Sequence, residues 1–300
     1  PLGIPKLLMA TTVSGDVRKL VDGADTMLFY PIVDVDGDNS ILRPMIKRLA
    51  DTAAVVKSDG PINMVERERR VALSMYGVTT PCVQLVERQL RLIGVEPLVF
   101  HANGAGGATI ERFARQHLIG AIADLTLAEL SNEVVGGAYP AGRDRMTAAS
   151  CTGIPQVIAP GSIDMVAFGP GHVMPEKFKD HLTCAHNDLV TLVRTTPNEC
   201  YQIGKKLAER LGAPKADTVV CVPLGGTSMM DQPGEVFYNP EAVRAFHEGL
   251  KDFASSEIQI ETSPKNINDP DFAARIFSHL VTFLEMTSTG KMTQQLNSRE

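Results

Sequence analysis

The stretch EPLVFHANGAGGATIERFARQ, residues 96–116, changes character at its middle. Its first five residues form a mostly apolar run of strand length, and apolar residues recur at helical spacing after the glycines. The three glycines and the asparagine between these two parts predict a tight turn from strand to helix. A strand, a turn and a helix in this order form one unit of an α/β fold.

The same order recurs along the chain, where short apolar runs alternate with amphipathic stretches. Runs typical of strands covered by helices on both faces occur at 6–10, 26–30, 70–75, 96–100, 121–125, 155–159, 218–222 and 258–261. Helix starts are indicated by a capping residue before proline or by a capping box, at Thr80-Pro81, Thr126 with Glu129, Thr196-Pro197 with Glu199, Asn239-Pro240 and Asp269-Pro270. Strands that alternate with capped helices predict a doubly wound parallel sheet.

A polar stretch, KSDGPINMVERERR at 57–70, interrupts this alternation. We therefore expect two α/β subdomains, at 1–60 and 70–300, joined by a linker at 61–69. The first has only two strands and is too small for a good core of its own. Because the chain also begins at Pro1 without a methionine, we expect the first subdomain to be incomplete and a further N-terminal portion to precede it.

Composition excludes several classes of protein. The chain has 300 residues, 44% of them hydrophobic, with 29 basic and 35 acidic side chains and a net charge of −6. No basic run is interleaved with aromatics, which argues against a nucleic-acid partner. No apolar stretch approaches the roughly 20 residues that span a bilayer, and no secretory signal is visible. Five scattered cysteines indicate reduced thiols, so we expect a cytoplasmic protein.

The loops that follow the predicted strands are rich in glycine and small polar residues. Backbone N–H groups at helix N-termini attract anions, so we expect a phosphate-bearing ligand there. The residues predicted to hold it are Ser14, Gly15, Thr79, Thr80, His101, Asn103, Gly104, Gly106 and Gly107. The alternative is that glycine and hydroxyl residues serve only the turns. The dinucleotide fingerprint fails, since Thr109 stands where its third glycine belongs, and no P-loop motif occurs.

Three further groups of side chains are candidates for chemistry. Asp16, Asp124, Glu129, Asp164 and Asp231 follow predicted strands; of these, Asp164 and Asp231 are the Mg²⁺ or acid/base candidates, with His101 as a further acid/base candidate. His181, Cys184 and His186 in HLTCAH mix metal-ligand types, but we expect a solvated loop without zinc because no partner pair is visible. Ser162 and Ser228 lie on predicted turns outside any G-x-S-x-G motif, so no nucleophile is assigned.

Six blocks carry a resemblance to a known family: GIPKLLMATTVSGDV, YGVTTPCVQ, VFHANGAGG, GIPQVIAPGSIDMVAFGP, TLVRTTP and INDPDFA. In this order they are similar to a family of largely uncharacterised bacterial, fungal and plant proteins, which includes the N-terminal ATP-binding domain of a tomato protein that confers resistance to tomato mosaic virus. The resemblance covers residues 1 to about 284. It implies two Rossmann-like subdomains, nucleotide binding and a preceding N-terminal portion. Family versions often carry Thr at the positions of Asn103 and Ala105 and H-x-H-N at 184–187, which puts side-chain assistance to the phosphates in doubt.

Two hypotheses for function follow. The first is an ATP-binding protein, with or without Mg²⁺, that holds phosphates in its glycine-rich loops and serves regulation or interaction. The alternative is an enzyme that acts on a phosphorylated or carboxylated metabolite in the same crevice, with His101, Asp164 or Asp231 as acid/base. An open sheet edge in the first subdomain also favours a homo-oligomer, most simply a dimer.

Overall fold

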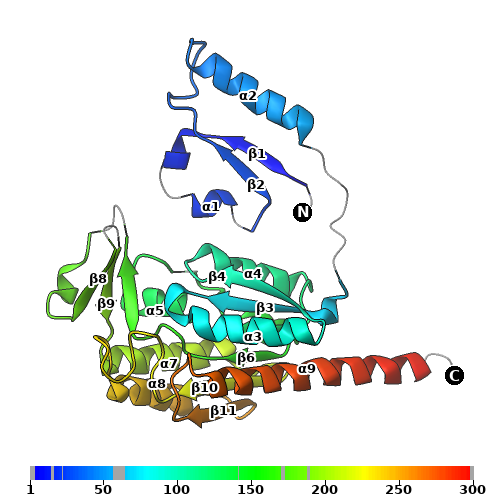
Figure 1. Ribbon diagram of the computed structural model, residues 1–300, viewed down its shortest axis with the longest axis vertical. Helices are drawn as coiled ribbons and strands as arrows, with labels where there is room; N and C mark the ends of the chain where they lie inside the picture. The colour runs from blue at the N-terminus through cyan, green and yellow to red at the C-terminus, as the bar shows by residue number, and fades with distance from the viewer. Residues whose placement is uncertain are drawn as a thin grey trace. The chain divides into compact units, whose positions relative to one another are not determined.

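The computed structural model describes residues 4–14, 17–21, 23–56, 65–140, 142–169, 173–187 and 190–297. The chain forms two compact units, residues 1–64 and 65–300, which are drawn in Figure 1. Among the described residues, no helix is both long enough and apolar enough to cross a membrane.

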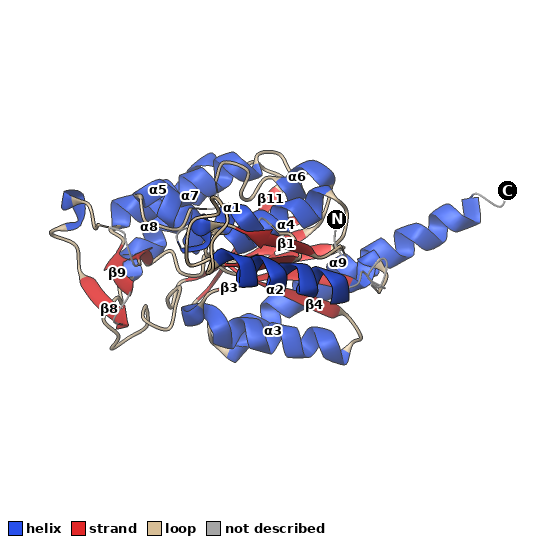
Figure 2. Cartoon of the chain, turned by 90° about the horizontal axis from the view of Figure 1, so that it is seen from above, coloured by secondary structure: helices blue, strands red, loops and turns tan. Residues whose placement is uncertain are grey.

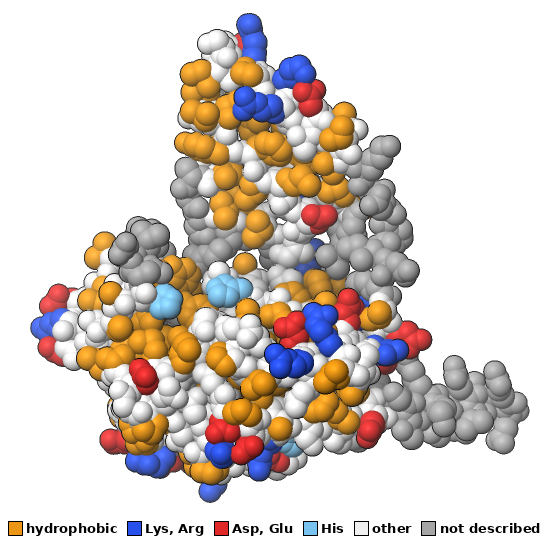
Figure 3. All heavy atoms as spheres, in the orientation of Figure 1, with side chains coloured by type: hydrophobic (Ala, Val, Ile, Leu, Met, Phe, Trp, Pro, Cys, Tyr) orange, Lys and Arg blue, Asp and Glu red, His pale blue; other side chains and the backbone are white. Residues whose placement is uncertain are grey.

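The first unit contains a two-stranded parallel sheet in which Lys6 pairs with Thr26. Its elements are β1 (Lys6–Met9), η1 (Thr11–Ser14), α1 (Arg18–Val21), β2 (Thr26–Phe29) and α2 (Leu42–Val55). Both strands were predicted. Leu42 is buried at 2% exposure, whereas many large hydrophobic side chains remain exposed, among them Met27, Tyr30, Ile32, Ile46 and Val55. Hydrophobic side chains cover much of the face of this unit in Figure 3. So small a unit buries little apolar surface, as its size predicts.

The second unit is built on a six-stranded sheet in which every pair of neighbours is parallel. Its strands are β3 (Arg70–Met75), β4 (Glu96–His101), β5 (Ala121–Asp124), β6 (Gln156–Ile158), β10 (Thr218–Pro223) and β11 (Ile258–Ser263), in the spatial order β11-β10-β6-β5-β3-β4. All six strands were predicted, and the α/β class with a Rossmann-like parallel sheet is confirmed. Their apolar runs are continuous because alternate residues point to opposite faces, both of which are covered.

Helices cover both faces of this sheet (Figure 2). They are α3 (Thr80–Leu92), α4 (Ala105–Arg115), α5 (Ala128–Val135), α6 (Ala148–Thr152), α7 (Pro197–Leu211), α8 (Pro240–Phe253) and α9 (Pro270–Asn297), with 3-10 turns η2 (Arg67–Arg69), η3 (Gly77–Thr79) and η4 (Glu176–Phe178). α3 and α9 pack on one face, where Val219 and Cys221 of β10 lie. α5, α7 and α8 pack on the other, against Val220 and Val222. Neighbouring residues of one strand therefore belong to two separate cores.

A three-stranded antiparallel sheet was not predicted. It consists of β7 (Met165–Phe168), β8 (Thr183–Asn187) and β9 (Val190–Arg194), in the order β7-β9-β8. The pairs include Met165 with Arg194 and Cys184 with Leu192, and β8 has an irregularity between Ala185 and Asn187. The expectation of a solvated loop at HLTCAH, residues 181–186, is therefore wrong for 183–186. A short strand of mixed polarity gives no clear alternation, and its pairing comes from the partner strand.

The predicted helix caps divide into two groups. Thr196 and Glu199 form the expected capping box, since each side chain bonds the other's backbone N–H. Asn239 accepts N–H bonds at the start of α8, and Asp269 accepts the N–H of Asp271 at the start of α9.

At the other two predicted starts the hydroxyl groups have different partners. Thr80 lies inside α3 and donates to the carbonyl of Tyr76, so it is not the cap. The box of Thr126 and Glu129 is also wrong, because α5 begins at Ala128 with no side-chain cap. The polar groups of Thr126 and Glu129 are used instead in contacts with other loops.

Candidate functional site

The order of the parallel strands places a topological switch point between β3 and β5. The chain leaves β3 through α3 towards β4 and returns from β4 through α4 to β5 on the other side of β3. Ligands of open α/β sheets bind beyond the carboxyl ends of the strands at such a point.

At this switch point the chain's own polar groups meet. Ser74 Oγ donates to Asp124 Oδ1 at 2.6 Å and accepts the N–H of Thr126 at 2.9 Å. The hydroxyl of Thr126 also lies 2.7 Å from that of Thr79. All four residues are at most 2% exposed. Their hydrogen bonds join the ends of β3 and β5 directly, so these groups are not available to a ligand.

The glycine-rich turn between β4 and α4 has a structural reason for each of its glycines. Gly104 has φ of +104°, in the region that favours glycine. A Cβ on Gly106 would overlap the carbonyl of His101, and one on Gly107 would overlap the carboxylate of Glu129. The density of glycine here therefore follows from backbone conformation and close packing, and does not by itself indicate a ligand.

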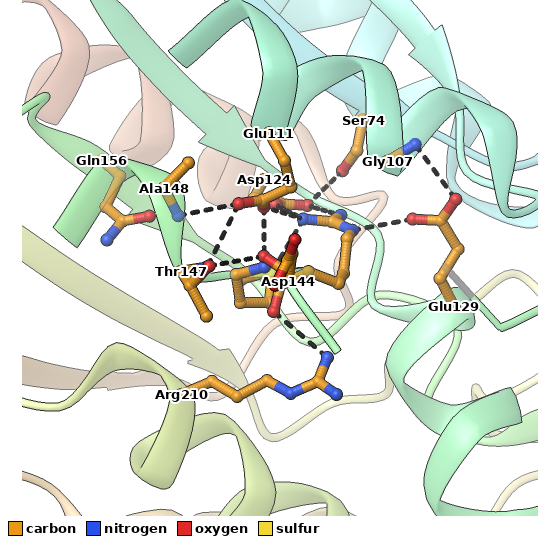
Figure 4. A network of polar contacts seen from close by, with 12 residues as sticks. Ser74, Gly107, Glu111, Asp124, Glu129, Asp144, Thr147, Ala148, Gln156 and Arg210 are labelled. Atoms are coloured by element: carbon orange, nitrogen blue, oxygen red, sulfur yellow. Dashed lines mark hydrogen bonds and ion pairs between the residues drawn. The ribbon is translucent and has the colours of Figure 1, made fainter. Parts of the chain in front are cut away.

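This turn does bind an anion, and the anion is a side chain of the same chain. Glu129 Oε1 accepts the N–H groups of Gly104 at 2.6 Å and of Gly107 at 3.0 Å. Glu129 Oε2 accepts Arg145 Nε at 2.7 Å. Two donors at the start of α4 are thus already used by an internal carboxylate, which Figure 4 shows beside Gly107.

Arg145 is the centre of this buried network, and its three carboxylate partners Glu111, Asp124 and Glu129 are labelled in Figure 4. Its side chain is 1% exposed and makes a bidentate pair with Asp124 at 2.5 and 2.7 Å. Glu111 lies 3.5 Å from Arg145 Nη1 and accepts the N–H groups of Met146 and Ala148 at 2.6 and 2.7 Å. The network therefore joins β5, α4, α5 and the start of α6.

Protonation in the network follows from burial and charge. Burial acts to lower the pKa of Arg145, but the carboxylates of Asp124, Glu129 and Glu111 outweigh it and raise that pKa well above its usual value. Burial raises the pKa of Glu111, against the opposing effect of Arg145. A permanent cation among three carboxylates is a structural element that holds the glycine-rich turn in place.

Part of the turn remains available for a ligand. Within the described part of the chain, nothing accepts the N–H groups of Ala105 and Gly106, in the first turn of α4. The half-buried side chain of Asn103 likewise has no hydrogen-bond partner among the described residues. His101, which is exposed, stacks on Tyr76 with ring centroids 5.4 Å apart.

A small pocket lies next to this turn. Its volume is about 150 Å³, and it is lined by Tyr76, Gly77, Val78, His101, His186 and Leu192. The residues come from the end of β4, from Tyr76 and η3 directly after β3, and from β8 and β9 of the antiparallel sheet. Histidine side chains reach the surface on the face drawn in Figure 3. The pocket therefore has an aromatic wall, and two imidazoles line it.

Asp164 and Asp231 lie together, but they are enclosed. They are 1% and 0% exposed. Asp164 accepts the hydroxyls of Ser228 at 2.7 Å and Thr227 at 3.1 Å. Asp231 accepts the N–H and hydroxyl of Thr227, each at 3.0–3.1 Å, and faces Arg194 at 3.5 Å. Burial, and then the charge of Asp231, raise the pKa of Asp164 to about 6.

The remaining predicted ligand residues are distributed as follows. Ser14 ends η1 in the first unit, and Gly15 and Asp16 lie outside the described residues. Thr79 is fully buried, and its hydroxyl is bonded to Tyr76 and Thr126. Of the predicted set in the second unit, His101 and Asn103 present side chains that a ligand can reach.

The other predicted groups differ in their contacts. His181 Nε2 lies 3.3 Å from both carboxylate oxygens of Glu199, and Cys184 and His186 lie on β8. Ser228 donates to Asp164. Ser162 is buried with φ of +62°, and its Oγ has no partner in the described part of the chain.

Sequence reasoning missed the residues that support the turn. Glu111 occupies the apolar side of α4 beside Gly107, Ile110 and Ala114, and a carboxylate in such a position is a signal of an internal ion pair. Arg145 stands in an irregular segment, where no local pattern marks it. Tyr76, the first residue of YGVTTPCVQ, was not among the predicted ligand residues.

The fold and site define a class: an α/β protein with a Rossmann-like parallel sheet and a glycine-rich turn at the carboxyl end of β4. Within that class the chain belongs to the Uncharacterised protein family (UPF0261). Residues 1–59 match the N-terminal domain of this family, and residues 68–284 match its C-terminal domain.

Several relatives extend this finding. A UPF0261 protein of Clostridium tetani is 40% identical over 286 residues, 95% of this chain and 70% of the relative. A UPF0261 protein of Rhizobium meliloti is 36% identical over 275 residues, 91% of this chain and 69% of the relative. The ToMV resistance protein Tm-1(GCR237) of Solanum lycopersicum is 34% identical over 294 residues, 96% of this chain but 39% of the tomato protein. The family predicted from the sequence is confirmed.

Proposed function

We propose that this protein binds ATP and that a phosphate group lies at the free first turn of α4. The observation that carries the proposal is the pair of N–H groups of Ala105 and Gly106, which lack acceptors among the described residues. Positive partial charge at a helix N-terminus favours a phosphate there. Asn103 and His101 stand beside these groups and can donate further hydrogen bonds.

The aromatic wall supports a nucleotide as the ligand. Tyr76 and His101 stack on each other and line the pocket of about 150 Å³. Sites for whole ligands of this size usually enclose about 300–1,000 Å³, so the pocket would enclose only part of ATP. Asp164 and Asp231 are buried and already hydrogen-bonded, so they do not bind Mg²⁺ in our proposal. The ion would instead be bound to the phosphates of ATP.

Calorimetric titration of ATP with Mg²⁺ into the 300-residue chain tests the proposal. The informative variant is Asn103→Ala, since each glycine of the turn is needed for packing or conformation. We expect the parent to bind and the variant to bind about tenfold more weakly, as for loss of one hydrogen bond to a charged group. His101→Gln should weaken binding to a similar extent.

Asn198→Ala is the matched control. Asn198 is an exposed asparagine in the first turn of α7, which is capped by Thr196. Its replacement should leave ATP affinity unchanged. The proposal fails if the folded parent does not bind ATP, or if Asn198→Ala weakens binding as much as Asn103→Ala does.

A catalytic role at the same position is the second proposal. Of the three acid/base candidates only His101 is exposed, and it stands beside the free N–H groups. It would act as the acid or base towards a phosphorylated or carboxylated metabolite. The measurement is phosphate release from ATP by the parent and by His101→Gln, and equal background rates would argue for binding alone. A homodimer and a cytoplasmic location remain predictions.

A further inference from the structure

Three side chains with different donor atoms meet on the α9 face of the sheet. Cys221 of β10 and Glu261 of β11 are register partners in parallel strands, and His279 comes from α9. The thiol sulfur, one carboxylate oxygen and one ring nitrogen all lie within 4.8 Å of one another. His279 Nε2 is 3.2 Å from Glu261 Oε2. Three elements distant in sequence thus bring together one sulfur, one oxygen and one nitrogen.

This set of donor atoms suits a particular kind of ion. Zinc binds Cys sulfur at about 2.3 Å and His nitrogen or carboxylate oxygen at about 2.0–2.2 Å. Tetrahedral angles then place the ligand atoms roughly 3.3–3.8 Å apart. The 3.2 Å between His279 Nε2 and Glu261 Oε2 is already close to this value. The sulfur of Cys221 lies within 4.8 Å of both atoms, so binding requires the thiol to move towards them. Magnesium and calcium prefer sets of oxygen atoms, which this group does not offer.

The site has an open side as well as a buried one. Cys221 is 1% exposed. The side chains of Glu261 and His279 are 22% and 20% exposed, and β11 is an edge strand. A metal ion can therefore approach from solvent and reach the buried sulfur last.

Arg275 is the competing cation. Its Nη1 donates to Glu261 Oε2 at 3.0 Å, and its side chain is 46% exposed. This is the oxygen that His279 also contacts. A long, half-exposed side chain can turn into solvent at little cost, so a metal ion can replace it.

We propose that Cys221, Glu261 and His279 form a zinc-binding site, with water as the fourth ligand. Burial raises the pKa of the Cys221 thiol to about 12, so the group carries a proton that binding must release to solvent. The bound ion would connect β10, β11 and α9 and so stabilise the fold against unfolding.

Titration of cobalt(II) chloride into the full chain tests the proposal, because a cobalt–thiolate bond absorbs in the near ultraviolet. We expect this band to saturate at one cobalt per chain and to disappear on addition of zinc chloride. Cys221→Ser should lose the band. Cys151→Ser and Cys184→Ser, which change the more accessible thiols, should keep it.

Two further variants keep the test decisive if Cys221→Ser does not fold. His279→Gln leaves the thiol in place and should weaken cobalt binding by at least about tenfold, since a ligand is lost. Arg275→Gln removes the competing cation and should strengthen cobalt binding. The proposal is overturned if the folded parent gives no band with excess cobalt, or if the band depends on Cys151 or Cys184. It is also overturned if His279→Gln binds cobalt as tightly as the parent.

Discussion

The turn after β4 and the loop after β10 look alike in sequence but differ in the structure. HANGAGG and PLGGTSMMD both combine glycine with small polar residues at the carboxyl end of a parallel strand. The first gives two N–H groups to Glu129 and leaves those of Ala105 and Gly106 without acceptors among the described residues. The second directs its hydroxyls onto the buried Asp164 and Asp231. We call HANGAGG the half-open turn, because some of its donors remain for a ligand. We call PLGGTSMMD the closed loop, because its hydroxyls are bonded to buried carboxylates.

The difference shows that loop composition measures the supply of hydrogen-bond donors and not their availability. Glycine and hydroxyl residues supply N–H and O–H donors in both loops. Whether a ligand can use them depends on which internal carboxylates are within reach. These carboxylates are Glu129 for the first loop and Asp164 with Asp231 for the second.

The largest effect on stability is expected from Arg145→Met, in the ion-pair network that holds the half-open turn. This change leaves Asp124, Glu129 and Glu111 buried without their cation. Removing one partner of a buried ion pair costs about 3–5 kcal/mol. The free energy of unfolding, measured by urea denaturation at pH 7, should therefore fall by that amount. Arg91→Met is the control, because the Arg91 side chain is 61% exposed and its pair with Glu87 should contribute under about 0.5 kcal/mol. Similar small losses for both variants would show that the network does not hold the turn.

An intermediate effect is expected beside the closed loop, at Asp164, which accepts hydroxyls of that loop. Asp164→Asn should change the pH dependence of stability. Burial raises the pKa of Asp164 from 3.8 to about 6 in the folded protein. Between these values the folded state binds more protons than the unfolded state. Asp164 therefore makes the parent less stable as the pH rises from about 4 to about 6, a loss that the asparagine variant does not share.

Urea denaturation of both proteins at pH 4, 5.5 and 7 measures this difference. The free energy of unfolding of the variant minus that of the parent should increase by about 1–3 kcal/mol from the lowest to the highest pH. Asp144→Asn serves as the control, because the Asp144 side chain is 78% exposed. A difference that stays constant with pH would mean that the loop around Asp164 is open to water.

The parallel sheet was predictable because its strands are buried on both faces. All six of its strands appear in the sequence as apolar runs, and those at Thr218–Pro223 and Ile258–Ser263 extend only one or two residues beyond their predicted ends. The antiparallel sheet was not predictable in this way. β8 reads TCAHN, and its strand conformation depends on pairing with β9.

The site was predictable only in part, for a related reason. His101 and Asn103 are found from their place after a strand, which is local information. The sequence of Thr126 and Glu129 also fits a local pattern, but their partners Thr79, Gly104 and Gly107 come from other loops. Arg145 pairs with residues 16 to 34 positions away. No local pattern contains such contacts.

The smallest effect is expected from Ser162→Gly, which asks whether the segment between β6 and β7 stores strain. The N–H of Ser162 donates to the carbonyl of Thr227 in the closed loop at 2.9 Å. Ser162 has φ of +62° and a buried Oγ without a partner among the described residues. A left-handed conformation costs a non-glycine residue about 1–2 kcal/mol. Glycine avoids this cost but loses more chain entropy on folding, which offsets part of the gain. The free energy of unfolding should therefore rise by about 0.5–1 kcal/mol. Ser162→Ala keeps the strain and removes only the hydroxyl, so comparing the two variants separates the backbone contribution from the side-chain one. A loss of stability in both would mean that the hydroxyl is bonded in solution. The segment between β6 and β7 would then resemble the half-open turn, with a polar group that has a use outside the contacts of the fold.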